Sequence, residues 1–222
     1  MSPPIAILQH VPHEGPGAIA TLAAKRGMAT TVTRLDLDDP LPSPDAIAGL
    51  VVLGGPMGAD DAEEHPWIVP ERVLVAATLA HGVPTLGVCL GAQVLARSQG
   101  AKLMRGPEPE MGMGTVDIAA AARTDPLLGP ESPALECFHW HGDTFDLPAG
   151  AVLLAGNAAY PHQAFRIGRG WGLQFHVEVD GGLAGDWAPH LPDGVSVDVP
   201  ALEPVGRRVI GAWLDRVEAA GR

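Results

Sequence analysis

The sequence is poor in cysteine, in aromatic residues and in positive charge. Only two of its 222 residues are cysteine, and 5% are aromatic. Two cysteines cannot build the disulfide framework of a small secreted protein, so each must be explained by packing or by chemistry. The 14 Lys and Arg residues against 26 Asp and Glu give a formal net charge of −12. This charge argues against a surface that binds nucleic acid or an anionic membrane.

Long apolar runs are also missing. No stretch approaches the ~20 consecutive apolar residues of a transmembrane helix. The first residues, Met-Ser-Pro-Pro-Ile, do not begin the charged and then apolar pattern of a signal peptide. We therefore expect no membrane partner and a cytoplasmic protein. The 46% of hydrophobic residues can fill a core, which excludes a disordered chain.

The first hundred residues alternate strand-like and helix-like patterns. Short apolar or β-branched runs predict strands at 5–11, 30–35, 50–53 and 84–88. Helices are expected between them, from Gly17 to Gly27, from Pro70 to Gly82 and over 90–98. The second of these should bury Val69, Val73, Ala76 and Leu79. Such alternation predicts a parallel sheet that helices cover.

The second half of the chain contains more strands and ends in a helix. Strands are expected at 115–119, 135–141, 151–154, 163–167 and 172–177, and the short connections favour antiparallel additions to the same sheet. Residues 180–203 should be mostly loop. Val205, Val209, Trp213 and Val217 predict a final amphipathic helix. No linker divides the chain, so residues 1–222 are interpreted as one domain.

Cys89 lies where a predicted strand runs directly into a predicted helix, with Gly87 two residues before it and Gly91 two residues after it. This is the layout of a nucleophile elbow with cysteine in place of serine. The helix dipole and the free N–H groups at a helix N-terminus favour the thiolate form. We therefore interpret Cys89 as a nucleophile and Cys137, which lacks this frame, as a core residue.

A thiolate that attacks a carbonyl needs two N–H donors for the oxyanion. One should be Leu90, the residue after the nucleophile. The other is expected from Gly55, in the glycine-rich loop after the third strand, because only glycine lets a backbone approach so closely. In a doubly wound sheet this loop and the elbow lie at the same edge.

Two histidine patterns remain. His176 and Glu178 are two residues apart on one predicted strand face, so the carboxylate can orient the imidazole as in a catalytic triad; a solvated polar face would give the same pattern. His139 and His141 should also share a face. A His-x-His pair is a zinc pattern, and with His176 and Glu178 it could supply four ligands. Nothing in the spacing demands this, and we expect no metal and no other cofactor.

With these residues the chain resembles the class I (triad-type) glutamine amidotransferases, especially free-standing proteins similar to the glutaminase domain of GMP synthetase. The matching segments are 53–56, 87–93, 139–143 and 174–178. The resemblance implies a flavodoxin-like three-layer α/β/α fold, in which a mostly parallel sheet carries antiparallel additions. It implies Cys89, His176 and Glu178 as the triad.

The resemblance also implies the oxyanion donors and the substrate contacts. The donors would be Gly55 and Leu90. Gln93 would hold the amino-acid end of the substrate, as would the backbone of Gly142 and Asp143, and Glu110 matches a glutamate near the same pocket. The segment 110–114 lacks the aromatic residue that relatives often carry there.

The activity implied is hydrolysis of the glutamine γ-amide through a γ-glutamyl thioester, with ammonia released or passed to a separate synthetase subunit. No phosphate-binding glycine loop with lysine occurs in the sequence, so we do not expect this chain alone to synthesise GMP. A γ-glutamyl peptidase or hydrolase would use the same residues. An intracellular cysteine peptidase of the same fold, a metal hydrolase and a regulatory subunit with a vestigial site are competing hypotheses.

Overall fold

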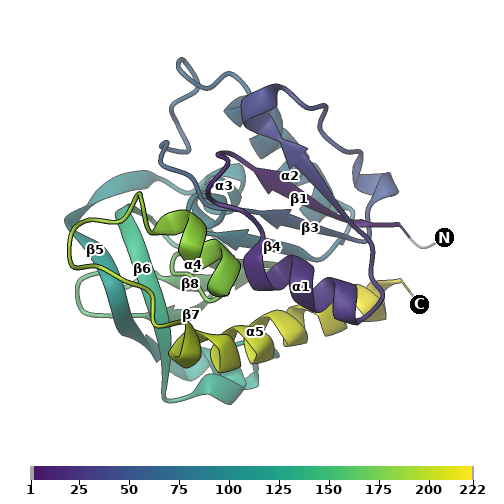
Figure 1. Ribbon diagram of the computed structural model, residues 1–222. Helices are drawn as coiled ribbons and strands as arrows, with labels where there is room; N and C mark the ends of the chain where they lie inside the picture. Colours follow the sequence, from purple (N-terminus) through teal and green to yellow (C-terminus); the bar gives the residue numbers. More distant parts are fainter. Residues whose placement is uncertain (1–2, 222) are drawn as a thin grey trace.

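One mixed β-sheet organises the protein, as seen in the computed structural model, which describes residues 3–221 (Figure 1). Its strands are β1 (Ile5–Gln9), β2 (Thr30–Arg34), β3 (Gly49–Val52), β4 (Thr85–Val88), β5 (Leu103–Ile118), β6 (Ala134–Phe145), β7 (Val152–Gly156), β8 (Ala164–Ile167) and β9 (Gly170–Leu173). They lie in the order β2-β1-β3-β4-β9-β8-β7-β5-β6.

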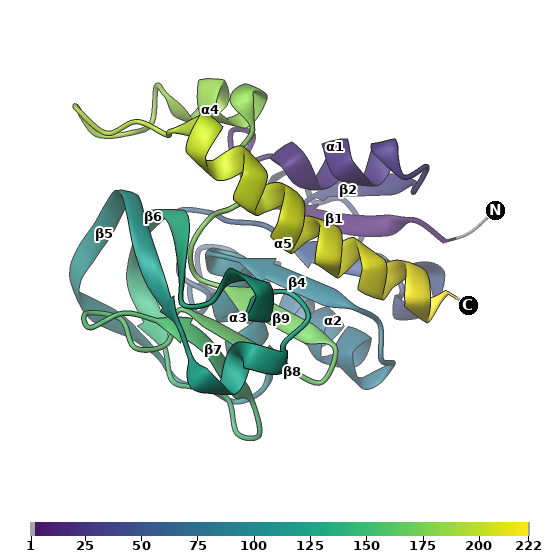
Figure 2. The ribbon, with the colours of Figure 1, turned by 90° about the horizontal axis from the view of Figure 1, so that it is seen from below.

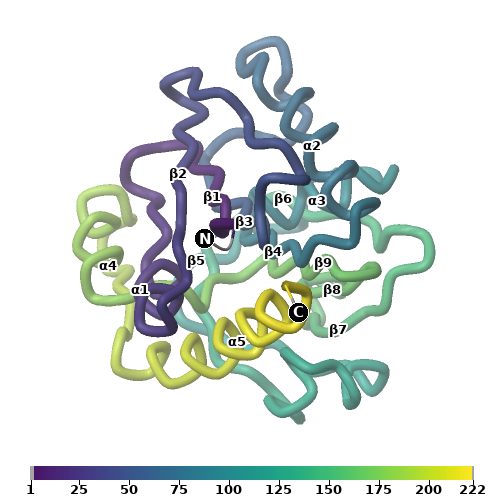
Figure 3. The backbone as a smooth tube through the Cα atoms, turned by 90° about the vertical axis from the view of Figure 1, so that its right-hand side faces the viewer, coloured from purple at the N-terminus to yellow at the C-terminus, as the bar shows by residue number. Residues whose placement is uncertain are grey.

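The five strands from β2 to β9 in this order are parallel and are covered on both faces. Helices α1 (Gly17–Lys25) and α5 (Val199–Ala220) lie against one face, and α2 (Ile68–Ala80) and α3 (Leu90–Ser98) against the other (Figures 2 and 3). Side chains of β1 alternate between these layers: Ile5 and Ile7 join the core under α1 and α5, while Leu8 joins the core under α2 and α3. The expected three-layer architecture is confirmed.

The remaining strands extend the sheet with antiparallel pairs, as expected. β5 and β6 form a long ribbon at the edge, with an irregular register between Arg105 and Glu110. β5 begins twelve residues before the predicted strand at 115, because it pairs along nearly the whole of β6. This ribbon carries the 139–143 segment to the end of the sheet where Cys89 lies.

The segment after β9 corrects two predictions. β9 ends at Leu173, so residues 174–178 are not a strand; instead the backbone of His176 bonds in both directions to Phe138 of β6, which draws the chain out of the sheet. The predicted loop over 180–203 contains helix α4 (Gly181–Trp187), and α5 already begins at Val199. The side chains of Asp180 and Asp198 accept hydrogen bonds from N–H groups in the first turns of α4 and α5. Aspartate at these positions caps the start of a helix, which explains why helices begin within a segment that looks like loop.

The predicted buried face of α2 is wrong for its two valines, although Leu79 does pack against the core. Val69 and Val73 are 44% and 64% exposed, whereas Glu71 is fully buried together with Leu74 and Val75. The carboxylate of Glu71 binds a buried histidine, and this pairing turns the helix in a direction that hydrophobic periodicity alone does not indicate. The amphipathic face predicted for α5 is confirmed, since Val205, Val209, Trp213 and Val217 are all buried.

None of the helices within residues 3–221 is both long enough and apolar enough to cross a membrane.

Candidate active site

Cys89 occupies the junction between β4 and α3 in a strained backbone conformation. Its φ of 53° and ψ of −109° belong to a region that side chains other than glycine rarely adopt. The neighbours must be small: a Cβ on Gly91 would collide with the carbonyl of Val52, and one on Gly87 with the backbone of Gly91. The turn holds the cysteine at the N-terminus of α3, with Sγ 3.6 Å from the carbonyl oxygen of Trp140.

His176 and Glu178 form a buried pair beside this cysteine. Nδ1 of His176 lies 2.6 Å from Oε1 of Glu178, and Oε2 accepts a hydrogen bond from the N–H of Val177 at 2.9 Å. Nε2 of His176 is buried and makes no hydrogen bond within the described residues. Burial opposes the imidazolium, but the charge of Glu178, the hydrogen bond to Glu178 and the neighbouring Cys89 raise the pKa of His176 well above its usual value.

Four neighbouring elements fix the segment that carries this pair. Its backbone bonds to Phe138 of β6, and the carbonyl of Glu178 accepts from the N–H of Ala18 at the start of α1. Helix α5 approaches through Gly206, where any side chain would collide with the carbonyl of Val177. From α4, Trp187 places its ring edge-on to the imidazole of His176, with the centroids 4.8 Å apart. These contacts hold the imidazole in one orientation.

The glycine loop after β3 is anchored by a histidine that the sequence analysis did not identify. His10 is fully buried; its Nδ1 lies 2.8 Å from the carbonyl oxygen of Gly54, and its Nε2 lies 2.8 Å from Oε1 of Glu71. Burial lowers the pKa of His10, but the charge and hydrogen bond of Glu71 outweigh it and the pKa is raised. Both ring nitrogens face acceptors, so an imidazolium satisfies this arrangement best.

A pocket of about 300 Å³ opens in front of the cysteine. Its lining includes Cys89, Gly55, Gln93, Gly142 and Asp143, so the structure gathers most of the residues singled out from the sequence around one space. Leu90 does not line it with its side chain, which is buried below. Within residues 3–221, the N–H groups of Leu90 and Gly55 donate to no backbone carbonyl. Gln93 also donates to the side chain of Gln174, at 3.2 Å.

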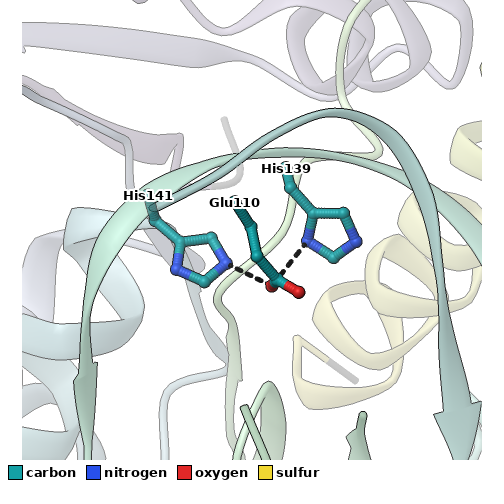
Figure 4. A group of neighbouring side chains, drawn as sticks. All are labelled: Glu110, His139 and His141. Atoms are coloured by element: carbon teal, nitrogen blue, oxygen red, sulfur yellow. Dashed lines mark ion pairs between the residues drawn. The ribbon is translucent and has the colours of Figure 1, made fainter. Parts of the chain in front are cut away.

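At one wall of this pocket, which His141 lines, His139 and His141 share a face of β6, as predicted (Figure 4). Their partner is Glu110 of β5 and not the His176–Glu178 pair considered from the sequence. Burial lowers the pKa of both imidazoles, that of His141 to about 4. Cys137 lies in the core, where burial raises the pKa of its thiol, in agreement with its interpretation as a packing residue.

Comparison with known proteins identifies the family. The profile of "Glutamine amidotransferase class-I" matches residues 17–188, most of the chain. The chain belongs to this family. The glutamine amidotransferase-like protein YfeJ of Salmonella typhimurium is 30% identical over 174 residues, which cover 76% of this chain and 73% of that protein. GMP synthase of Shewanella sediminis is 33% identical over 140 residues, 59% of this chain; the match spans only 25% of that enzyme.

Solved structures of this family have the same fold. A glutamine amidotransferase from Thermotoga maritima superposes with a TM-score of 0.82 at 29% identity, covering 97% of both chains. One from Methylobacillus flagellatus gives 0.81, also at 29% identity, over 98% of this chain and 93% of the other. The flavodoxin-like assignment is thereby confirmed.

Besides His10, three other residues near the site are not predicted from the sequence. Glu71 was hidden in a helix interpreted as apolar, and Trp187 in a segment interpreted as loop. Glu14 lies against Gly54, where its oxygen would meet any side chain, and burial raises its pKa despite nearby His176 and His10. These residues are recognised only because their side chains point inward in the folded structure, and the sequence does not show which side chains point inward.

Proposed function

We propose that the protein is a cysteine-dependent glutaminase that hydrolyses the γ-carboxamide of glutamine or of a γ-glutamyl compound. The observation that carries the proposal is the strained elbow at Cys89, beside an imidazole whose far nitrogen binds a carboxylate. Family membership supports hydrolysis of a glutamine amide as the class of reaction. Cys89, His176 and Glu178 would act as nucleophile, acid–base and orienting group.

In the first step the thiolate of Cys89 attacks the γ-carbonyl carbon and the C–N bond then breaks. The N–H groups of Leu90 and Gly55, which bind no backbone carbonyl, would stabilise the oxyanion. His176 supplies the proton that the amide nitrogen needs to leave as ammonia. The raised pKa of His176 favours the protonated form that this step requires.

In the second step the neutral His176 takes a proton from water, and the resulting hydroxide attacks the γ-glutamyl thioester. The C–S bond breaks, glutamate leaves, and the thiolate–imidazolium pair is restored. Glu178 would accept a hydrogen bond from Nδ1 of His176 and so keep Nε2 directed at the reacting atoms. Gln93 and the backbone of Gly142 and Asp143 would hold the amino-acid end of the substrate, since all three line the pocket.

The fate of the ammonia is part of the proposal. Relatives include GMP synthases described as glutamine-hydrolysing, of which this chain matches about a quarter. A separate synthetase subunit would therefore be a fitting acceptor, and the protein would act in the cytoplasm as one domain.

A substrate panel with the purified protein tests the proposal. Glutamine and several γ-glutamyl dipeptides are incubated with the wild type, Cys89→Ala and His176→Ala, and released ammonia or amine is measured. Each substitution should lower turnover by about 10⁴-fold or more. A glutamine-like diazo-ketone should add its mass to the peptide that contains Cys89.

The same panel separates the competing functions. Ammonia from glutamine alone favours an amidotransferase subunit, and turnover of dipeptides favours a γ-glutamyl hydrolase. Unchanged turnover in Cys89→Ala would refute the nucleophile assignment. A folded wild type that neither turns over any substrate nor reacts with the diazo-ketone would indicate a regulatory protein.

A further inference from the structure

The group formed by Glu110, His139 and His141 lies outside the proposed reaction and has an unusual geometry. Antiparallel pairing sets Glu110 directly opposite His141 and sets Gly112 opposite His139, so the three side chains project from one face of the β5–β6 ribbon (Figure 4). Gly114 leaves the space that the ring of His139 fills. The ribbon therefore brings two imidazoles and one carboxylate together by its register.

Two imidazole nitrogens converge on a single oxygen. Nδ1 of His139 and Nε2 of His141 lie 3.5 Å and 3.2 Å from Oε2 of Glu110. Both nitrogens are buried, and neither makes a hydrogen bond within the described residues. The side chain of His141 is only 1% exposed. Buried nitrogens with no partner need an explanation.

The remaining polar atoms of the group are oriented by other residues. Nδ1 of His141 lies 3.3 Å from the carbonyl oxygen of Asp143; if it carries the proton, the lone pair of Nε2 points at Glu110. The two carboxylate oxygens of Glu110 accept hydrogen bonds from Asn157 and Gln163, each at 2.8 Å. Lone pairs on nitrogen and oxygen that face one another repel unless a cation lies between them. Outer hydrogen bonds of this kind are typical around metal ligands.

We propose that Glu110, His139 and His141 bind one divalent transition-metal ion of the zinc type. Three ligand atoms lie within 4.8 Å of one another. Ligands of a tetrahedral zinc ion, at bonds of ~2.0–2.1 Å, are about 3.3–3.4 Å apart, which agrees with the two separations above. Two imidazoles with one carboxylate favour zinc over magnesium or calcium, which prefer oxygen ligands.

The position of the site gives it a role distinct from that of Cys89. His141 also lines the pocket in front of the cysteine, so the ion would stiffen the wall formed by β5 and β6. Glu110, 21% exposed, provides the path from solvent. A water or an oxygen of a pocket ligand would complete the coordination. This inference does not depend on the proposed glutaminase activity.

Metal binding is tested in the Cys89→Ser protein, so that the reactive thiol cannot bind the ion. After treatment with a chelator and gel filtration, the protein is titrated with Zn²⁺, and with Co²⁺ followed by its visible absorption. One ion per chain is expected, together with a rise in melting temperature. Adding Glu110→Gln or His141→Ala should weaken binding by about 100-fold or more and remove that rise.

Matched controls separate a built site from surface histidines. His81→Ala removes an exposed histidine, and His190→Ala breaks the stacked pair with His13; neither should change the affinity. If His141→Ala is unstable, Glu110→Gln serves as the test variant, because glutamine keeps the shape of the side chain. Circular dichroism checks that this variant is folded. Absence of stoichiometric binding in Cys89→Ser, or equal affinity in Glu110→Gln, would overturn the proposal and leave an ion-pair network.

Discussion

The strained backbone at Cys89 predicts that a glycine there makes the protein more stable than an alanine does. Cys89→Ala and Cys89→Gly both remove the sulfur, so the comparison between them isolates the backbone. At φ 53° and ψ −109° an alanine keeps the strain, whereas a glycine adopts this conformation freely. At an ordinary position the order is the reverse.

Two opposing terms set the magnitude. Relief of an unfavourable φ and ψ is worth about 1–3 kcal/mol. The greater freedom of glycine in the unfolded chain costs about 0.4–1 kcal/mol relative to alanine. The net expectation is that Cys89→Gly is more stable than Cys89→Ala by about 1 kcal/mol, which corresponds to a melting temperature higher by ~2–4 °C in a chain of this size.

Urea unfolding of the two variants, at equal slope, measures this difference directly. The matched control is Ala76→Gly in the middle of α2, which should lower the free energy of unfolding by about 1 kcal/mol relative to the wild type. If Cys89→Gly is less stable than Cys89→Ala by a similar amount, the elbow is not strained and the reasoning fails. Both variants should lack glutaminase activity.

Three further predictions concern charge and reactivity. Because the pKa of His10 is raised above 6.5, its pairing with Glu71 stabilises the fold fully below that pH, and the contribution is lost as pH rises through the raised value. The difference in unfolding free energy between wild type and Glu71→Gln should therefore fall as pH rises above 6.5, and a constant difference would contradict the ion pair. Glu178→Gln should lower turnover by about 10²–10⁴-fold, less than loss of the imidazole, because the ring loses its orienting carboxylate but remains; equal losses in turnover assays would argue against that role. Iodoacetamide should modify Cys89 and spare Cys137, whose burial raises its thiol pKa, and peptide mass spectrometry detects the modified residue.

Local patterns indicated much of the architecture. The alternation of strands and helices in the first hundred residues, and the helix from Leu90 to Ser98, follow from periodicity and glycine positions that neighbouring residues determine. Irregular connections were harder. The chain after Leu173 leaves the sheet because it bonds to Phe138, a residue far away in sequence, and no local signal marks that departure.

The candidate site divides in the same way. Cys89 with its flanking glycines, and His176 two residues before Glu178, are short motifs that mark candidate residues in the sequence, although the strand expected to carry the second motif ends at Leu173. The sequence by itself therefore determined the elbow, the residue types around it and the sheet that carries them. Only the tertiary structure decided that Glu71 turns inward to His10, and that Glu110 meets two histidines across a ribbon. The physical reason is that register and helix rotation depend on burial and pairing between distant segments, which no local pattern encodes.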